Sequence, residues 1–206
     1  MDDHAPIVIF CYRRKINSLI SSLLKNKRSI NSKLFIFSDG YKSQFDRNDV
    51  LELRKSLIKI KGFKSIKIIE AKKNNGLANS IIHGVKYVIN KFGKAIILED
   101  DLIVSPFFVD YMNDALRYYE SKNNIWSISG YCPSLNCLKN YNKEVYLSLR
   151  SSSWGWATWA DRWNKARWSM KYFKSFKTKK DKIKIFNQGG NDLFKMLELQ
   201  YLKKID

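Results

Sequence analysis

Three consecutive acidic residues, Glu99, Asp100 and Asp101, stand inside an apolar run that extends from residue 95 to residue 104. Such a run, with little sign of a helical face, predicts a buried strand, where carboxylates are costly unless a positive charge compensates them. A hard divalent cation does this, because Mg²⁺ and Mn²⁺ prefer oxygen ligands and Mg²⁺ takes further ligands from substrate phosphates. The triplet therefore indicates a metal–diphosphate site where a strand ends. The alternative interpretation is that the acids only end the strand and cap a turn.

Two more polar positions follow predicted strands. Arg13 and Arg14 come after the apolar segment 7–11. Arginine suits bidentate contacts with phosphate, and a solvated surface pair is the alternative. Asp39 stands in a Ser-Asp-Gly turn after the segment 34–37. It either shapes this turn or accepts hydrogen bonds from the base or ribose of a nucleotide.

The second half of the chain holds further candidates. Trp154 and Gly155 belong to the sequence Ser-Ser-Ser-Trp-Gly-Trp, which suits either a core or a loop whose aromatic faces stack on a sugar ring. Asp192 follows Gly-Gly-Asn at the start of a predicted helix. An acid is favoured there by the helix dipole, with Asn191 as the cap. The functional alternative is a general base that takes a proton from an attacking hydroxyl.

Strands and helices alternate in the first 122 residues. Strands are predicted at 7–11, 34–37, 66–69 and 95–98, and helices at 16–24, 50–57, 81–89 and 106–119. This alternation predicts an α/β fold with a mostly parallel, Rossmann-like sheet flanked by helices. Ligands bind beyond the carboxyl ends of strands in such sheets. The arginine pair, Asp39, the segment 74–79 and the acidic triplet should therefore meet at one edge.

The pattern changes after about residue 122. Two strands are predicted at 125–129 and 145–149, and a helix follows Asp192. Residues 171–184 are rich in lysine, with aromatic and isoleucine residues interleaved. This stretch is interpreted as a solvated basic face, and contact with anionic lipid headgroups is the alternative.

Composition bounds the possible partners. The 206 residues are 45% hydrophobic and carry a formal net charge of +19, which allows nucleic acid, an anionic membrane or phosphate-bearing substrates. Cysteine occurs only at Cys11, Cys132 and Cys137. This low, odd count fits a reducing cytosol, and the spacing does not predict a zinc site. With no visible signal peptide and no apolar stretch of roughly 18–20 residues, we expect a cytoplasmic protein.

The ordered set of motifs resembles a known family. Leu98–Leu102 followed by Ser105–Phe108 resembles the metal motif and following helix of GT-A fold glycosyltransferases. The similarity is to bacterial family-2-type enzymes and to the N-acetylglucosaminyltransferase I group. Ile125–Gly130 and Ser153–Trp156 fall in the matching order and spacing. The resemblance extends from Ile7 to about Met196, and it implies a nucleotide-sugar-binding half at 1–122 and a smaller acceptor-side part at 123–206.

The resemblance also implies an activity and the roles of particular residues. The expected enzyme uses Mn²⁺ or Mg²⁺ to move a sugar from a UDP-sugar to a hydroxyl of a glycan or lipid-linked acceptor, with inversion, in bacterial surface-glycan biosynthesis. By position, the implied roles are Arg13 on the diphosphate, Asp39 on uracil or ribose, Glu99 on the ribose, Asp100 on the donor sugar, Asp101 on the metal, Trp154 and Gly155 at the donor, and Asp192 as the catalytic base.

Family members continue well past the helix that follows the base. This sequence ends soon after it, so we expect the acceptor side to be incomplete. Two rival functions remain. A nucleotidyltransferase would show a glycine-rich basic loop after the first strand, which the segment 11–15 lacks. A basic nucleic-acid-binding module would leave the acidic triplet unexplained, and we expect no specific nucleic-acid partner.

Overall fold

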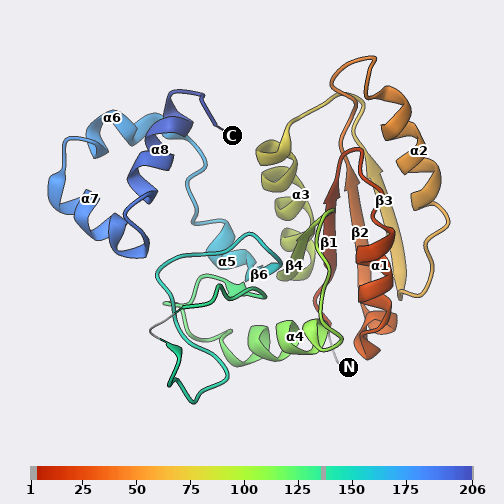
Figure 1. The fold of residues 1–206 in the computed structure, drawn as a ribbon, viewed down its shortest axis with the longest axis horizontal. Coiled ribbons are helices and arrows are strands. Elements are labelled where there is room, and N and C mark those ends of the chain that lie inside the picture. Colours follow the sequence, from red (N-terminus) through yellow and green to blue (C-terminus); the bar gives the residue numbers. More distant parts are fainter. Residues whose placement is uncertain (1–3, 136–137, 206) are drawn as a thin grey trace. The chain divides into compact units, whose positions relative to one another are not determined.

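A computed structural model of the chain describes residues 4–135 and 138–205. Six strands of this part form one sheet in the order β3-β2-β1-β4-β6-β5 (Figure 1). Parallel pairing joins the first four along the chain, and β6 runs antiparallel to both β4 and β5. The predicted α/β fold with a mostly parallel sheet is confirmed. The strands are β1 (Ile7–Cys11), β2 (Lys33–Ser38), β3 (Ser65–Glu70), β4 (Lys94–Glu99), β5 (Ile128–Ser129) and β6 (Trp156–Trp159).

The helices of the first half lie where apolar residues recur at helical spacing. Each of the four has buried side chains on one stripe and exposed polar residues elsewhere, as expected for amphipathic helices on a sheet. None of the described helices is both long and apolar enough to cross a membrane. The α-helices are α1 (Asn17–Leu24), α2 (Arg47–Leu57), α3 (Leu77–Phe92), α4 (Phe108–Tyr118), α5 (Ala160–Trp163), α6 (Phe173–Phe176), α7 (Lys180–Phe186) and α8 (Leu193–Tyr201).

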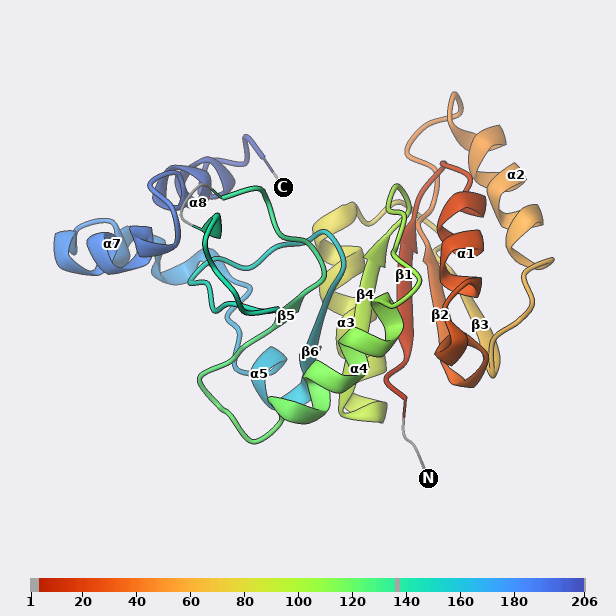
Figure 2. The same ribbon diagram turned by 60° about the horizontal axis from the view of Figure 1, so that its bottom comes forward.

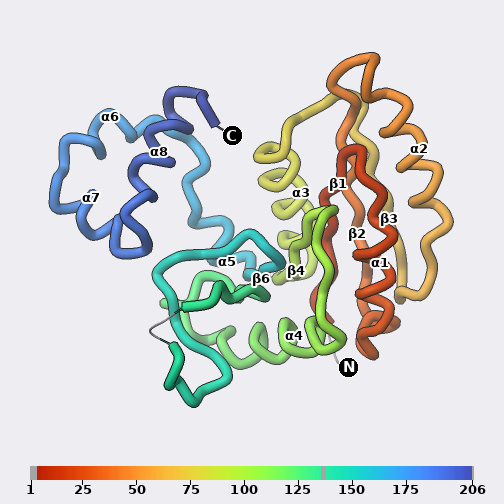
Figure 3. The backbone as a smooth tube through the Cα atoms, in the orientation of Figure 1, coloured from red at the N-terminus to blue at the C-terminus, as the bar shows by residue number. Residues whose placement is uncertain are grey.

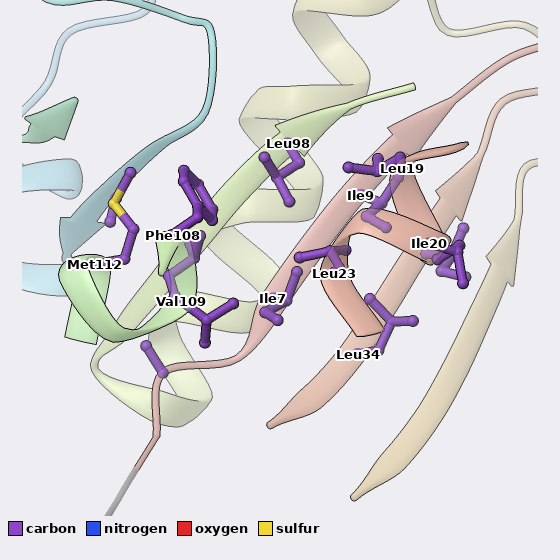
Figure 4. Packing of buried hydrophobic residues seen from close by; sticks show 14 of the residues in the cluster. Ile7, Ile9, Leu19, Ile20, Leu23, Leu34, Leu98, Phe108, Val109 and Met112 are labelled. Carbon is purple, nitrogen blue, oxygen red and sulfur yellow. The ribbon is translucent and has the colours of Figure 1, made fainter. Parts of the chain in front are cut away.

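Helices cover both faces of the sheet, because alternate residues of each strand point to opposite sides. Ile7 and Ile9 of β1 pack in a core with α1, α2 and α4. Figure 4 shows the part of this core between β1, α1 and α4 in close view. Val8 and Phe10 pack in a second core with α3 and α5. Figure 2 shows α3 on the side of the sheet opposite to α4. In this arrangement the carboxyl ends of β1, β2 and β4 continue into loops.

The chain divides into two compact units. The first unit is Met1–Tyr131 with Ser152–Ala166, and it contains the whole sheet. The second unit is Cys132–Ser151 with Arg167–Asp206, and it contains α6, α7 and α8. The predicted division into a donor half at 1–122 and an acceptor-side part at 123–206 stays a prediction.

The strand predicted at 145–149 is wrong, since this segment forms no strand. Its apolar residues Val145, Leu147 and Leu149 are 42%, 69% and 75% exposed. Alternating apolar residues specify a strand only when a neighbouring strand takes their hydrogen bonds and a core takes their side chains. The sheet instead gains β6 from the tryptophan-rich segment, whose Ala157 is buried and pairs with Ile96.

Candidate functional site

The acidic triplet lies where β4 ends, beside the end of β1. Glu99 is the last residue of β4, and Asp100 and Asp101 form the turn after it. Nη1 of Arg14 donates a 2.8 Å hydrogen bond to Oδ2 of Asp101 and lies 3.6 Å from Oδ1 of Asp100. The backbone N–H of Tyr12 donates to Oδ2 of Asp100 at 3.3 Å. The loop after β1 and the turn after β4 therefore form one polar site.

Burial makes two of these carboxylates, those of Glu99 and Asp100, costly to ionise. Desolvation raises the pKa of Glu99, and the neighbouring charges of Asp101 and Asp100 raise it further. Desolvation also raises the pKa of Asp100, against the opposing effect of the Arg14 guanidinium. The side chain of Asp100 is only 14% exposed, whereas that of Asp101 is 57% exposed. Additional positive charge at this turn would stabilise the ionised forms.

The donor chemistry of the turn fits a divalent cation that shares its ligands with a substrate. In the described part of the chain, no group of three or more His, Cys, Asp or Glu side chains is arranged to hold a metal ion. Asp100 and Asp101 instead supply two adjacent carboxylates, and Mg²⁺ typically binds one or two carboxylates together with substrate phosphates. These residues fit Mg²⁺ or Mn²⁺ when a phosphate completes the coordination.

Hydrogen bonds fix the segment that carries the acidic turn into α4. Figure 3 shows this segment running back along the sheet from the end of β4 to the start of α4. The buried Asn26 side chain donates to the carbonyl of Ser105 at 3.0 Å and accepts from the N–H of Val109 at 2.9 Å. The N–H of Val104 donates to Oγ of Ser22 at 3.1 Å. The turn is thus anchored to a rigid base, as a binding site requires.

Asp39 lies at the end of β2, as predicted, and its carboxylate accepts several hydrogen bonds from the backbone and one from the side chain of Asn75. It accepts hydrogen bonds from the N–H groups of Gly40, Asn75 and Gly76 at 2.9–3.1 Å. Gly76 adopts a positive φ of 78°, which a glycine tolerates without strain. Asp39 therefore holds the loop before α3 against the end of β2, and its contact with a base or ribose stays a prediction.

A pocket of about 600 Å³ lies beside Asp39, between α3 and strands β2 and β3. Its volume is in the range of small-molecule sites, roughly 300–1,000 Å³. Gly84 lets α3 approach the sheet, since a Cβ there would lie 2.5 Å from the Phe10 ring. The lining combines apolar and polar groups: Phe37, Ser38, Asp39, Lys67, Ile68, Ile69, Ala71, Asn75, Ser80, His83, Gly84 and Tyr87.

Trp154 and Gly155 also reach the carboxyl edge of the sheet. The antiparallel register pairs Trp156 with Ile97, so the residues before β6 lie beside the end of β4. Gly155 has φ 71°, and a Cβ there would lie 3.2 Å from the Phe108 ring. The half-exposed Trp154 ring contacts Tyr131 in a T-shaped pair with 4.5 Å between centroids. Tyr131 was not predicted, although it directly follows the Ile125–Gly130 motif.

The arginine that contacts the acids is Arg14. Arg13, which the resemblance places on the diphosphate, is exposed and forms no ion pair with a described carboxylate. Its phosphate contact stays a prediction. The sequence indicates both arginines as candidates. The side chains of adjacent loop residues point in different directions, so only the structure shows which of the two contacts the acids.

Asp192 belongs to the second unit, where it directly precedes α8. Its two carboxylate oxygens accept hydrogen bonds from the Arg150 guanidinium at 2.6 and 2.9 Å. This bidentate pair lowers the pKa of Asp192. The carboxylate is therefore a weaker base while Arg150 is bound. Arg150, 42 residues distant in sequence, was not predicted.

The two described cysteines are free thiols. Burial raises the pKa of the Cys11 thiol to about 12, so it is an unreactive core side chain. Cys132 is exposed, and Cys137 lies outside the described residues.

Comparisons with known proteins give the chain no family. No protein-family model matches it, and no curated protein matches it. Among solved structures, it is similar to a mannosyltransferase from Pyrobaculum calidifontis in complex with GDP-Man and Mn²⁺, with 7% identity and a TM-score of 0.41 over 62% of this chain. The chain spans 36% of the length of that structure. It is also similar to a 4-diphosphocytidyl-2C-methyl-D-erythritol synthase from Anaerococcus prevotii, with 12% identity, a TM-score of 0.38 and 86% of each chain covered.

Proposed function

We propose that the chain is a metal-dependent glycosyltransferase that moves a sugar from a UDP-sugar to an acceptor hydroxyl. The observation that carries the proposal is the ion pair between Arg14 and Asp101, formed across the ends of β1 and β4 beside the poorly exposed Asp100. This arrangement brings a guanidinium and two carboxylates together at the carboxyl edge of the parallel strands. A nucleotide diphosphate with a divalent cation matches both charges.

The proposal gives each residue of the first unit a role. Asp101 would hold Mn²⁺ or Mg²⁺, which when bound neutralises charge on the departing diphosphate. Arg13 and Arg14 would bind phosphate oxygens through bidentate hydrogen bonds. Glu99 would face the ribose and Asp100 the donor sugar. Trp154, with Gly155 allowing close approach, would present an aromatic face to that sugar.

We assign the pocket beside Asp39 to the base of the nucleotide. The bases of nucleotides are planar and partly apolar, which suits a pocket with Phe37 and Ile69 in its lining and Ser80 and Asn75 as polar groups. Ser80→Trp would fill this pocket, and Lys86→Trp on the exposed face of the same helix is the matched control. Unchanged UDP binding by Ser80→Trp would refute the assignment.

The second unit supplies the proposed catalytic base. Asp192 would accept the proton of the acceptor hydroxyl as that hydroxyl attacks the anomeric carbon, which inverts the configuration. The Arg150 ion pair holds the carboxylate ionised, and its release would raise the basicity of Asp192 during transfer. The proposed acceptor is a glycan or lipid-linked glycan of the bacterial surface, and the proposed compartment is the cytoplasm, which the free thiols of Cys11 and Cys132 suit.

Product analysis tests the proposal against its nearest rival. The protein is incubated with a panel of UDP-sugars, with and without Mn²⁺, and the nucleotide products are separated. Glycosyl transfer or donor hydrolysis releases UDP, whereas a nucleotidyltransferase acting in reverse with pyrophosphate releases UTP. The control variants are Asp101→Ala, which should lose UDP release, and Asp49→Ala on the exposed face of α2, which should keep it. Metal-independent release that survives Asp101→Ala would reject the proposed site.

A further inference from the structure

The segment from Arg167 to Lys184 in the second unit carries eight basic side chains and one acidic side chain. All eight basic residues are exposed. None of them forms an ion pair with a carboxylate of residues 4–135 or 138–205. The segment therefore presents a concentrated positive charge, of which Lys177 lies near enough to Glu198 to interact with it electrostatically without forming an ion pair. We call residues 167–184, together with Ile185, the basic surface.

The basic surface is folded onto an aromatic cluster of its own unit. Phe173 is only 4% exposed and stacks on Tyr201 with 4.4 Å between ring centroids. Phe176 contacts Phe186 and Phe194 at 5.6 and 6.1 Å. Helices α7 and α8 lie side by side within this unit (Figures 1 and 2). These contacts hold the phenylalanines inward, so the lysines between them are left on the outside.

Apolar side chains accompany the charges on the outside. Tyr172 and Ile185 are each 64% exposed, and Trp168 is 49% exposed. The interface of a bilayer accepts this combination, because aromatic and aliphatic side chains enter the acyl boundary while lysines attract anionic headgroups. An exposed isoleucine has no comparable partner on the phosphate backbone of a nucleic acid.

The choice of basic residue also favours lipid over nucleic acid. Seven of the eight basic residues are lysines, whose compact ammonium acts as a point charge and lacks the planar fork used in bidentate recognition. The only arginine of the segment, Arg167, lies over the Tyr172 ring at 5.3 Å. From this charge, the absence of ion pairs between it and the described carboxylates, and the exposed apolar groups, we propose that the basic surface docks the protein on an anionic lipid bilayer. The proposal does not depend on sugar transfer.

Vesicle binding by the full chain tests the proposal. Sedimentation is measured with phosphatidylcholine vesicles and with vesicles containing about one third phosphatidylglycerol. We expect binding to the anionic vesicles only, weakened by salt. Charge reversal of three exposed lysines, Lys179→Glu, Lys180→Glu and Lys182→Glu, should weaken it by roughly tenfold or more. Ile185→Ser should weaken it at high salt, where the apolar contribution remains.

A matched triple variant separates this surface from the general charge of the protein. This control changes the net charge by the same amount as the first triple variant. It consists of Lys55→Glu, Lys59→Glu and Lys61→Glu, at exposed positions at the end of α2 and beyond. We expect this variant to keep most of the vesicle binding. Equal loss in both triple variants would overturn the proposal, as would absent vesicle binding. A different outcome would reassign the surface to nucleic acid: the protein binds no vesicles but binds an RNA or DNA oligomer tightly, and the triple variant at Lys179, Lys180 and Lys182 loses that binding.

Discussion

Arg14 and Asp101, which are 87 residues apart in sequence, are joined by a 2.8 Å hydrogen bond between Nη1 and Oδ2. This contact connects the loop after β1 with the turn after β4 and partly compensates three adjacent carboxylates. A guanidinium and a divalent cation are alternative partners for the same oxygen. In the proposed enzyme, Asp101 would bind the cation in place of Arg14, and Arg14 would then bind a phosphate.

Arg14→Ala should have opposite effects on two ligands. Without the competing guanidinium, we expect Mn²⁺ alone to bind roughly two- to fivefold more tightly, because an exposed ion pair contributes at most about 1 kcal/mol. UDP in the presence of Mn²⁺ should bind roughly tenfold more weakly, because a charged hydrogen bond to phosphate is lost. Titration calorimetry measures both. A parallel Arg13→Ala variant shows which arginine binds phosphate. Weaker Mn²⁺ binding by Arg14→Ala would contradict the proposed replacement of Arg14 by the cation at Asp101.

Asp100→Asn should stabilise the protein in the absence of ligands. Because the pKa of Asp100 is raised above its ordinary value of 3.8 in the folded state, the folded protein binds more protons than the unfolded chain between these two values. The protonated Asp100 side chain therefore contributes to stability at low pH, and this contribution is lost as the pH rises through the raised pKa. At pH 7.5 we expect Asp100→Asn to raise Tm by roughly 1–4 °C, with a smaller gain near pH 4.

Thermal unfolding at both pH values checks this prediction. Asp110→Asn is not a suitable control, because Asp110 is paired with Arg28 at 2.6 Å. Glu52→Gln is a better one, since Glu52 lies on the exposed face of α2 beyond its first turn. A loss of stability at pH 7.5 in Asp100→Asn would mean that the Arg14 interaction outweighs desolvation.

Asn26→Ala should destabilise the fold through the segment below the site. The variant leaves the buried N–H of Val109 and the partly buried carbonyl of Ser105 without their side-chain partner. An unsatisfied buried group costs about 1–3 kcal/mol, so we expect a loss of roughly 1–3 kcal/mol in the free energy of unfolding. Urea denaturation measures it, with the exposed Asn48→Ala as control. A loss no greater than in Asn48→Ala would show that the anchor is dispensable.

Asp192→Asn should separate catalysis from donor binding. The variant keeps the size of the side chain but cannot accept a full proton, so we expect kcat to fall by roughly 10²–10⁴. The KM for the donor should change little, because Asp192 has no proposed contact with it. Arg150→Ala should instead move the acidic limb of the pH–rate profile to higher pH, since it removes the main cause of the lowered pKa of Asp192. Equal activity of Asp192→Asn and the wild type would remove this residue from the mechanism.

The mostly parallel sheet and the position of the acidic triplet at the end of a strand could be predicted because local patterns decide them. Apolar strands followed by polar turns, separated by amphipathic helices, favour parallel pairing with the strand ends aligned. The strand at 145–149 could not be rejected in this way, because only the absence of a neighbouring strand excludes it. The contacts of Arg14, Asn26, Tyr131 and Arg150 could not be predicted, since each joins residues that are far apart in sequence.

The central claim is a metal-dependent nucleotide site at the end of β4. Calorimetric titration of UDP into the wild type and Asp101→Ala, each with and without Mn²⁺, tests it most directly. We expect the wild type to bind UDP at least roughly tenfold more tightly with Mn²⁺ than without it, and Asp101→Ala to lose this difference while remaining folded. Binding of UDP that is independent of Mn²⁺, or an effect of Mn²⁺ that persists in Asp101→Ala, would contradict the account.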